Sequence, residues 1–343
     1  MNIEPIPVTF IVTGYNQSDL IDAAIQGALA QAYPRLQIIL TDDCSADDTH
    51  DRMQAAAAAY RGAHQLLVNR PERNQGTLGN IYDAARHATG ELIVLAGGDD
   101  ISYPHRTSVL VERWKASKPD ALYSRYDVID EAGRIIERDY KPDSSGLWLR
   151  DYFPGQSIEP LHGASAACHK SVFARYPAPE RRVRSEDAFW TLMLALDGGR
   201  TEYVDQSLVQ YRKHAGAITN EVPPAPDRAA IAARERVQMS FASSQAGLLE
   251  LFAEQLGRRS VPPSVERILE DDLRMFRLRA RWDKAGISER LFAFPAARRR
   301  GQMSWLLPRL GGLGLFTATK SVALRRRHKP LAGEVRSGTG ASS

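Results

Sequence analysis

Two pairs of adjacent aspartates are the residues of this sequence whose type and spacing could do chemistry. Asp42-Asp43 follows the apolar run LQIILT, and Asp99-Asp100 follows ELIVLAGG. The two glycines before the second pair allow a sharp turn that aims carboxylates at a ligand. Hard divalent cations prefer carboxylate oxygens, and Mg²⁺ or Mn²⁺ often completes its coordination with substrate phosphate oxygens. Either pair alone could be a helix cap or a turn, but the second is suited to hold a metal–diphosphate unit.

The first 125 residues contain the elements that must position these pairs. Apolar, partly β-branched runs predict strands over 8–13, 36–41, 64–69 and 91–96. Helical periodicity predicts helices over 18–31, from about 47 to 60, and over 77–88. This alternation predicts right-handed βαβ units and a mainly parallel sheet, which binds ligands at the carboxyl ends of its strands. Both acidic pairs come at such ends, so we expect them to meet at one edge of the sheet.

Two common nucleotide-binding motifs are missing from the sequence. The first predicted strand does not lead into G-x-G-x-x-G, and no G-x-x-x-x-G-K-[ST] occurs. These absences exclude a dinucleotide fingerprint and a P-loop. Phosphates bound here would therefore be neutralised by a metal ion rather than cradled by a glycine-rich loop.

Composition narrows the class of protein. The 343 residues are 43% hydrophobic and 25% charged, which is ordinary for a globular protein. Cys44 and Cys168 are the only cysteines, too few for a disulfide framework or a four-thiolate zinc site. Neither a signal peptide nor about 18 uninterrupted apolar residues is found. We expect a cytoplasmic protein, with peripheral attachment to the inner face of the cell membrane as a further hypothesis.

Three segments in order, VTFIVTGYN, IILTDDCSADDT and GELIVLAGGDDISYPHR, resemble the family-2 glycosyltransferases. The likeness covers roughly residues 6–215. It implies an α/β protein of the GT-A fold, with a Rossmann-like, mainly parallel sheet flanked by helices, here followed by a helical C-terminal extension. It also implies inverting transfer of a sugar from a nucleoside-diphosphate sugar, UDP or dTDP, to an acceptor hydroxyl, with Mn²⁺ or Mg²⁺ as cofactor. Surface polysaccharide, O-antigen or glycolipid biosynthesis would use such a step.

The resemblance assigns a donor site. Tyr15 would stack on the base, and Asp43 would accept the N–H of a uracil or thymine ring. Asp100 is the expected direct metal ligand, and His214 in the segment YRKH is a candidate to contact the metal or a phosphate. Gly98 occupies the first position of the usual D-x-D triplet, which leaves one carboxylate fewer. The donor residues implied are Thr13, Tyr15, Asp43, Asn80, Asp99 and Asp100.

The resemblance also assigns an acceptor site. The segment LHGASAACH, with His162 and Gly163, would floor it, and SEDAFW would supply Glu186 as an acceptor contact and Asp187 as the catalytic base. A hydroxyl is a poor nucleophile until a carboxylate takes its proton, whereas a diphosphate whose charge a metal absorbs needs no acid catalyst. The alternative is a helix N-terminus decorated with acids. Both interpretations can hold together.

We expect a catalytic domain over 1–220, with a nucleotide-sugar-binding half over 1–125 and an acceptor-binding half over 126–220. A helical, basic region follows over 221–330, and a disordered tail over 331–343. Residues 284–329 contain eleven basic residues and one acidic residue. Leucines and aromatics beside these arginines suit an anionic membrane surface, contacted through 291–329. The alternative is a docked helical hairpin with a solvated basic face; nucleic acid is not an expected partner.

Two other functions are compatible with parts of this pattern. A catalytically inactive sugar-nucleotide-binding protein would keep Tyr15, Asp43 and the metal pair, but the presence of Asp187 disfavours it. A nucleotidyltransferase would carry a glycine-rich and basic first loop, which Thr13-Gly14-Tyr15-Asn16 is not. The acceptor is expected to be a saccharide or a lipid-linked saccharide.

Overall fold

The computed structural model describes residues 5–142, 152–153, 159–181, 183, 185–214, 227–257 and 262–327, with only the backbone of 322–327. The predicted disordered tail over 331–343 lies outside them. By their contacts the residues form two compact units, one of 1–220 with 244–273 and one of 221–243 with 274–343. The helices α8 (Arg228–Leu256) and α9 (Pro263–Ala280) each contribute residues to both units.

Four parallel strands form the first half of the sheet in the order β3-β2-β1-β4. Each matches a predicted strand to within one residue at either end. Thr13 pairs with Thr41 and with Gly97, so β1, β2 and β4 end at the same level. The two acidic pairs therefore follow strands that end at one edge of the sheet, as predicted. The strands are β1 (Val8–Gly14), β2 (Leu36–Asp42), β3 (Gln65–Asn69) and β4 (Leu92–Gly97).

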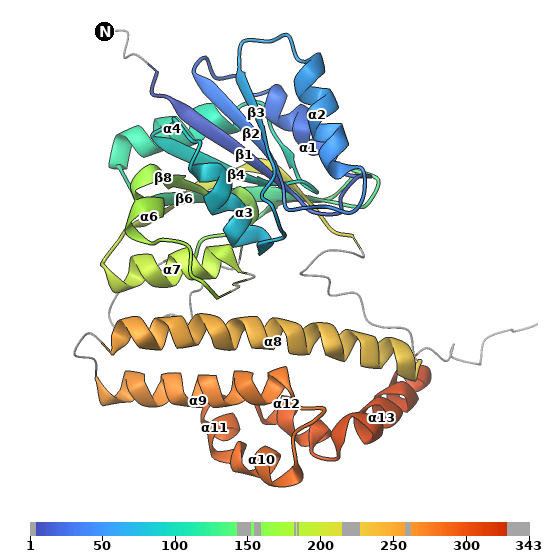
Figure 1. The fold of residues 1–343 in the computed structure, drawn as a ribbon. Coiled ribbons are helices and arrows are strands. Elements are labelled where there is room, and N and C mark those ends of the chain that lie inside the picture. The colour runs from blue at the N-terminus through green and yellow to red at the C-terminus, as the bar shows by residue number, and fades with distance from the viewer. Residues whose placement is uncertain are drawn as a thin grey trace, which may run out of the picture. The chain divides into compact units, whose positions relative to one another are not determined.

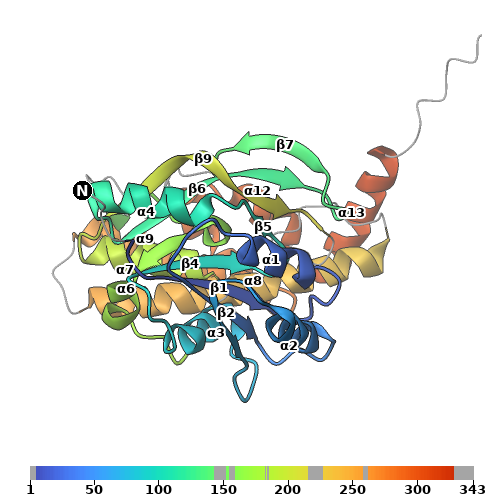
Figure 2. The same ribbon diagram turned by 90° about the horizontal axis from the view of Figure 1, so that it is seen from above.

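The second half of the sheet is mixed rather than parallel. Strand β8 runs antiparallel to both β4 and β6, β9 runs parallel to β6, and the short β5 and β7 pair antiparallel with β9 and β6. Figure 2 shows the order from β2 across β1 and β4 to β6 and β9. The strands are β5 (Ile101–Ser102), β6 (Ala121–Ile129), β7 (Ile135–Tyr140), β8 (Ala167–His169) and β9 (Thr201–Arg212).

Helices flank the sheet, which confirms the predicted α/β class (Figure 1). Helix α1 buries the face that its periodicity predicts, with Ile21 and Ile25 in one core cluster with Phe10 and Val12 of β1. Helix α4 adds Leu110 and Trp114 to the same cluster. The helices of this unit are α1 (Ile21–Leu29), α2 (Thr49–Ala59), α3 (Gly76–Ala85), α4 (Arg106–Ser117), the one-turn η1 (Gly163–Ser165), α6 (Lys170–Arg175) and α7 (Glu186–Leu196).

The C-terminal region is helical, as predicted, but many of its apolar residues face inward. Leu306 and Phe316 are buried in two core clusters, and Trp305 packs against both. These residues therefore belong to a core, which corrects the expectation that they face a membrane. None of the described helices has the length and hydropathy needed to cross a bilayer. Four short helices, α10 (Ile287–Phe292), α11 (Phe294–Arg299), α12 (Met303–Leu306) and η2 (Leu307–Arg309), are followed by the longer α13 (Gly312–Arg327).

Candidate active site

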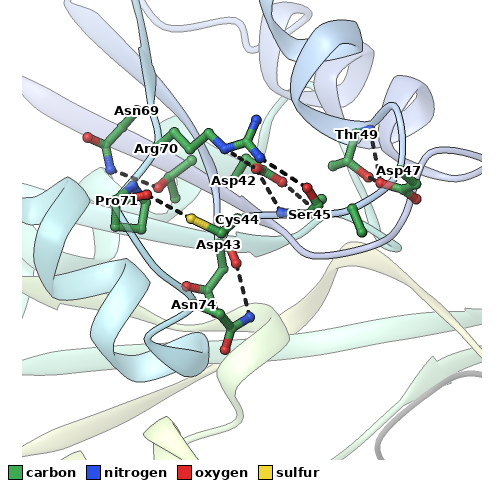
Figure 3. Close-up of polar contacts among 12 residues, drawn as sticks. Asp42, Asp43, Cys44, Ser45, Asp47, Thr49, Asn69, Arg70, Pro71 and Asn74 are labelled. Atoms are coloured by element: carbon green, nitrogen blue, oxygen red, sulfur yellow. Dashed lines mark hydrogen bonds and ion pairs between the residues drawn. The ribbon is translucent and has the colours of Figure 1, made fainter.

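The loop after β2 is built around Asp42 (Figure 3). Its buried carboxylate accepts a hydrogen bond from the Ser45 backbone N–H at 3.0 Å and another from the Ser45 hydroxyl. The Nε atom of Arg70 lies 3.3 Å from Asp42 Oδ2, and Arg70 also donates to the Ser45 carbonyl at 3.0 Å. Asp42 thus has a structural role, because its carboxylate closes the turn that presents its neighbour.

The carboxylate of Asp43 points toward α3. Its two oxygens accept from the backbone N–H groups of Gln75 and Gly76, at 2.7 and 2.8 Å. These groups belong to the start of α3, where N–H groups lack partners inside the helix and favour negative charge. A carboxylate oxygen has a second lone pair, so Asp43 can still accept an N–H from a ligand. The side chain chosen for the base contact is also the one that fixes the position of α3.

Asn80 has a structural role beside the donor contact predicted for it. The residue is 1% exposed, its Oδ1 accepts from the Thr41 hydroxyl at 2.5 Å, and its Nδ2 donates to the Thr41 carbonyl at 3.3 Å. Both the oxygen and the nitrogen of the amide are thus hydrogen-bonded to Thr41, near the end of β2. Asn80 thus fastens α3 to the strand that carries Asp42 and Asp43, and its contact with the donor stays a prediction.

The loop after β1 leaves one aromatic ring open. Asn16, which has a φ of 51°, donates its backbone N–H to Ser45 Oγ at 2.8 Å and accepts from the Ala46 N–H at 2.9 Å. Thr13 donates its hydroxyl to the Ala96 carbonyl at 3.3 Å. With the loop held at both sides, Tyr15 remains 49% exposed. An exposed ring on a fixed loop is suited to stack on a planar base.

Asp99 and Asp100 converge on the space above Gly97. A Cβ placed on Gly97 would lie 2.7 Å from Asp99 Oδ1 and 3.3 Å from Asp100 Oδ2, so glycine is needed to let both carboxylates turn back over the strand end. Burial, and secondarily the charge of Asp99, raise the pKa of Asp100 well above its usual range. His214 Nε2 lies 3.1 Å from Asp99 Oδ2. The structure pairs His214 with Asp99 rather than with Asp100.

These residues fit a divalent cation. Two carboxylates that face the same space repel each other, and a cation between them would remove both the repulsion and part of the cost of burial. Among the residues that the structure describes, no group of three or more histidines, cysteines and acids could enclose a metal by itself. Magnesium is usually held by one or two protein carboxylates together with phosphate oxygens and water, so a two-carboxylate site suffices.

Arg212 was not predicted as a site residue, yet it holds the acidic pair in place. The residue is 4% exposed; its backbone N–H donates to Asp100 Oδ1 at 2.9 Å and its Nε to the Asp99 carbonyl at 2.8 Å. Its Nη1 atom reaches the carbonyls of Asp130 and Glu131. The predicted strand ends gave no sign that β9 would lie beside the acidic pair.

Arg106 is the second residue that sequence reasoning missed. It is fully buried and donates to the carbonyls of Leu95, Ala164 and Ala166 and to the Ser102 hydroxyl. It occupies the core-facing row of α4 with Leu110 and Trp114. The sequence signal that could have identified it is a basic residue in an otherwise apolar row of a helix. Such a residue indicates a buried cation with specific partners, because a charge is rarely buried without one.

The predicted acceptor residues form a second cluster. Asp187 Oδ2 accepts from the Gly163 N–H at 3.3 Å, while Oδ1 accepts from the Ser185 hydroxyl at 2.8 Å and the Ala188 N–H at 2.7 Å. A Cβ on Gly163 would lie 2.1 Å from Glu186 Oε1, so only glycine fits here. Burial, followed by the charge of Asp187, raises the pKa of Glu186 to about 8. Glu186 is therefore protonated at neutral pH and lies beside the Asp187 carboxyl.

His162 connects the two clusters. Its ring stacks on Tyr126, with centroids 4.7 Å apart, and meets the edge of Tyr211 at 5.6 Å. Burial lowers the pKa of His162, with Asp187 opposing this effect, so the imidazole is neutral at pH 7. Since Tyr211 precedes Arg212, which bonds Asp100, the predicted donor and acceptor residues meet across β9. The arrangement can hold an anionic ligand and a hydroxylated one side by side.

Comparison with known sequences adds an independent line of evidence. Residues 9–179 match the family model described as Glycosyl transferase family 2. The chain is 33% identical over 227 residues to a protein named as a glycosyltransferase, EpsE of Bacillus subtilis (strain 168), with 64% of this chain and 77% of EpsE covered. It is 34% identical over 135 residues to the succinoglycan biosynthesis protein ExoO of Rhizobium meliloti (strain 1021), covering 39% of this chain and 37% of ExoO.

A further relative is the UDP-Glc:alpha-D-GlcNAc-diphosphoundecaprenol beta-1,3-glucosyltransferase WfaP of Escherichia coli, 28% identical over 133 residues. That match covers 39% of this chain and 48% of WfaP. The chain thus spans less than half the length of ExoO and of WfaP.

Two solved structures share the fold. S. aureus TarS 1–349 in complex with UDP-GlcNAc has a TM-score of 0.54 and 18% identity, covering 94% of this chain and 92% of that chain. The mannosyltransferase PcManGT from Pyrobaculum calidifontis, in complex with GDP-Man and Mn²⁺, also has a TM-score of 0.54 and 18% identity, covering 96% and 91%. At such identity the likeness shows the fold alone.

Proposed function

Because this chain belongs to glycosyl transferase family 2, we propose that it transfers a sugar, with inversion, from UDP-sugar or dTDP-sugar to an acceptor hydroxyl. The observation that carries this proposal is the convergence of Asp99 and Asp100 over Gly97, next to the cluster that contains Asp187. Glycosyltransferase activity in polysaccharide or glycolipid biosynthesis is supported by the relatives. The donor, the stereochemistry and the residue roles are our assignments.

The donor nucleotide would lie across the ends of β1, β2 and β4. Tyr15 would stack on the base and Asp43 would accept the ring N–H, with Thr13 beside the ribose. Uracil and thymine present the same N–H, so Asp43 suits both. TarS was solved with UDP-GlcNAc, which supports a uridine donor, although PcManGT was solved with GDP-Man.

Asp99 and Asp100 would hold Mn²⁺ or Mg²⁺ on the donor diphosphate, with His214 as a further candidate ligand or phosphate contact. The cation would neutralise charge on the leaving diphosphate. Mn²⁺ in the PcManGT structure supports this assignment. Arg212 keeps the acidic pair oriented, since it is bonded to both residues.

Asp187 would act as the general base. Three hydrogen bonds hold its carboxylate in one orientation, so it can take the acceptor proton without rearranging. The freed oxygen would attack the anomeric carbon from the face opposite the diphosphate, which inverts the configuration. Glu186, protonated at neutral pH, would donate a hydrogen bond to another acceptor oxygen, beside His162 and Gly163.

The acceptor would be a saccharide or a lipid-linked saccharide. WfaP carries a diphosphoundecaprenol acceptor in its name, and ExoO belongs by name to succinoglycan biosynthesis. On this proposal the enzyme works in the cytoplasm at the inner face of the membrane, where lipid-linked precursors are extended.

Calorimetry of UDP, dTDP, GDP and ADP, each with and without Mn²⁺, tests the donor site. We expect metal-dependent binding of UDP or dTDP that weakens at least about tenfold in Asp100→Ala, because a metal-held diphosphate loses its ligand. The matched control is Asp205→Ala, which removes an exposed carboxylate of β9 outside the site and should bind as wild type. Absence of binding by any nucleotide would refute the donor site, and binding without any sugar transfer would indicate a binding protein.

A further inference from the structure

We propose that the exposed face of α10 docks the protein on an anionic lipid bilayer. Three large apolar side chains of this six-residue helix lie in solvent: Ile287 is 65% exposed, Leu291 51% and Phe292 68%. Ile287 and Leu291 lie four residues apart and share one side of the helix, and Phe292 extends this exposed surface about 100° further round the helix. Figure 1 shows α10 among the short helices that follow α9.

The opposite side of α10 is firmly anchored. The buried guanidinium of Arg290 donates to the carbonyls of Trp282, Ala285 and Leu310, at 3.0, 2.6 and 2.8 Å. Ala293, the residue after α10, is buried in a core cluster that includes Leu306. This core is complete without the three exposed side chains. They therefore face outward because the helix is held in that orientation, and turning them inward would break the Arg290 bonds.

Basic residues lie beside α10, one in contact with it and the others close to it in sequence. The Arg274 guanidinium carbon lies 4.7 Å from the Phe292 ring centroid, and exposed Lys284 precedes the helix. Exposed Arg298 and Arg299 end the next helix, α11. The one acidic residue between 284 and 329, Glu289, is ion-paired with Arg281 at 3.0 Å. Leucine and aromatic side chains beside basic residues are suited to a membrane interface with anionic lipid.

Some basic residues of this region are bonded to groups inside the protein and are not exposed to a ligand. Arg309 and Lys320 approach buried Glu235, at 2.9 and 3.6 Å, and Arg290 is consumed by carbonyl groups. Arg290 and Arg309 are therefore engaged inside the protein, and Lys320, at 34% side-chain exposure, is only partly available. The proposed membrane surface therefore includes fewer residues than the predicted segment 291–329. It also starts before that segment, at Lys284 and Ile287.

A bilayer is a better occupant than a second protein. A stable protein interface buries roughly 800 Å² on each partner, far more than three side chains can supply. A membrane requires only a few inserted apolar groups, because attraction between basic residues and lipid phosphates adds to their burial. The inference deepens the inner-face location given in the proposed function, and its test does not use sugar transfer or nucleotide binding as the readout.

Vesicle flotation of the full chain tests the inference. Vesicles of phosphatidylcholine alone are compared with vesicles that also contain phosphatidylglycerol. We expect binding to the anionic vesicles only, weakened by added salt, and reduced roughly tenfold or more when Ile287, Leu291 and Phe292 are all changed to serine. The matched control, Val237→Ser with Phe241→Ser, removes exposed apolar residues of α8 and should float as wild type.

Three outcomes would overturn the inference. The first is that the triple variant floats as efficiently as wild type. The second is that the α8 control loses as much flotation as the triple variant. The third is that light scattering detects concentration-dependent dimers of wild type that the triple variant does not form. The charge variant Lys284→Glu with Arg298→Glu keeps the apolar side chains and should also reduce flotation, which guards against misfolding of the triple variant. Nucleotide binding should be unchanged in every variant, so failure here is distinct from failure of the donor site.

Discussion

Neighbouring carboxylates in this protein differ in role because their surroundings differ. The Asp42 carboxylate is bonded to Ser45 and Arg70 and closes the turn, whereas the Asp43 carboxylate accepts from the first N–H groups of α3. Asp187 receives three hydrogen bonds, whereas burial keeps the adjacent Glu186 protonated at neutral pH. Burial disfavours the charged form of a carboxyl group, which is why Glu186 holds its proton, while the hydrogen bonds to Asp187 fix the orientation of its carboxylate.

At the residue scale, Asp187→Asn tests the proposed base. The amide cannot accept the acceptor proton, so we expect kcat to fall by roughly 10² to 10⁴ while nucleotide binding is retained. Steady-state kinetics and calorimetry would measure the two effects separately. Asp197→Asn, at the other end of α7, is the matched control and should keep wild-type turnover. Wild-type turnover in Asp187→Asn would exclude it as the base.

Glu186→Gln tests the protonation state of the second carboxyl. Its folded-state pKa of about 8 lies above the ordinary 4.5, so the folded protein binds the proton more tightly than the unfolded chain does. Stability from this group is therefore complete below about pH 4.5 and is lost as pH rises toward about 8. Glutamine cannot ionise, so the Tm of the variant should rise relative to that of wild type as pH increases from about 4.5 to about 8. A Tm difference independent of pH would contradict the assignment.

At the scale of elements, single side chains hold segments far apart in sequence. Arg106 of α4 bonds the end of β4, the segment after Gly163 and β5, and Arg212 of β9 bonds the acidic pair. The donor edge and the acceptor floor are thus fixed relative to each other by buried guanidinium groups. A guanidinium is suited to this role because its five donors can serve several carbonyls at once.

Arg106→Met tests this connection. Methionine fills similar space but leaves buried carbonyl groups without donors, so we expect destabilisation of about 3 kcal/mol or more by urea unfolding. Arg106→Lys keeps the charge yet cannot reach every carbonyl, and should fall between methionine and wild type. Exposed Arg113→Met, on the same helix, is the control and should change stability by less than about 0.5 kcal/mol. Equal stabilities of all variants would argue against a connecting role.

At the scale of the whole molecule, each compact unit has its own core. The second unit is centred on a buried ion pair between Glu235 of α8 and Arg309 of η2, with N···O of 2.9 Å. The guanidinium of Arg309 also contacts the rings of Trp282, Trp305 and Phe316. Some basic residues of the C-terminal region, such as Arg309, are therefore engaged inside the second unit rather than exposed to solvent or lipid.

Breaking this pair one partner at a time should be costly. Among the described residues, Arg309→Met leaves buried Glu235 with Lys320, 3.6 Å away, as its remaining ion-pair partner, so we expect a loss of about 3–5 kcal/mol in the free energy of unfolding. The double variant Glu235→Met with Arg309→Met removes the stranded charge and should recover much of that loss. Urea titrations of the single and double variants measure both. A double variant less stable than Arg309→Met would mean that Glu235 stabilises the unit through contacts other than its ion pair with Arg309.

The sequence by itself determined the parallel half of the sheet and the aspartates at its edge. Strand periodicity and helical periodicity are local properties, and parallel strands joined by helices must end at one edge. The helical C-terminal extension was determined in the same way. The motifs in order also determined the family, because three matching segments constrain the chain far more than any one of them.

Only the tertiary structure decided which polar groups are already engaged. Asn80 is bonded to Thr41, His214 to Asp99, and Asp43 to the start of α3. The structure also decided that Arg106 and Arg212 hold the site together and that Phe292, not Phe316, faces solvent. These facts depend on contacts between residues far apart in sequence, such as β9 beside β5 and the acidic pair. No local pattern encodes such contacts, because burial and pairing are properties of the packed chain.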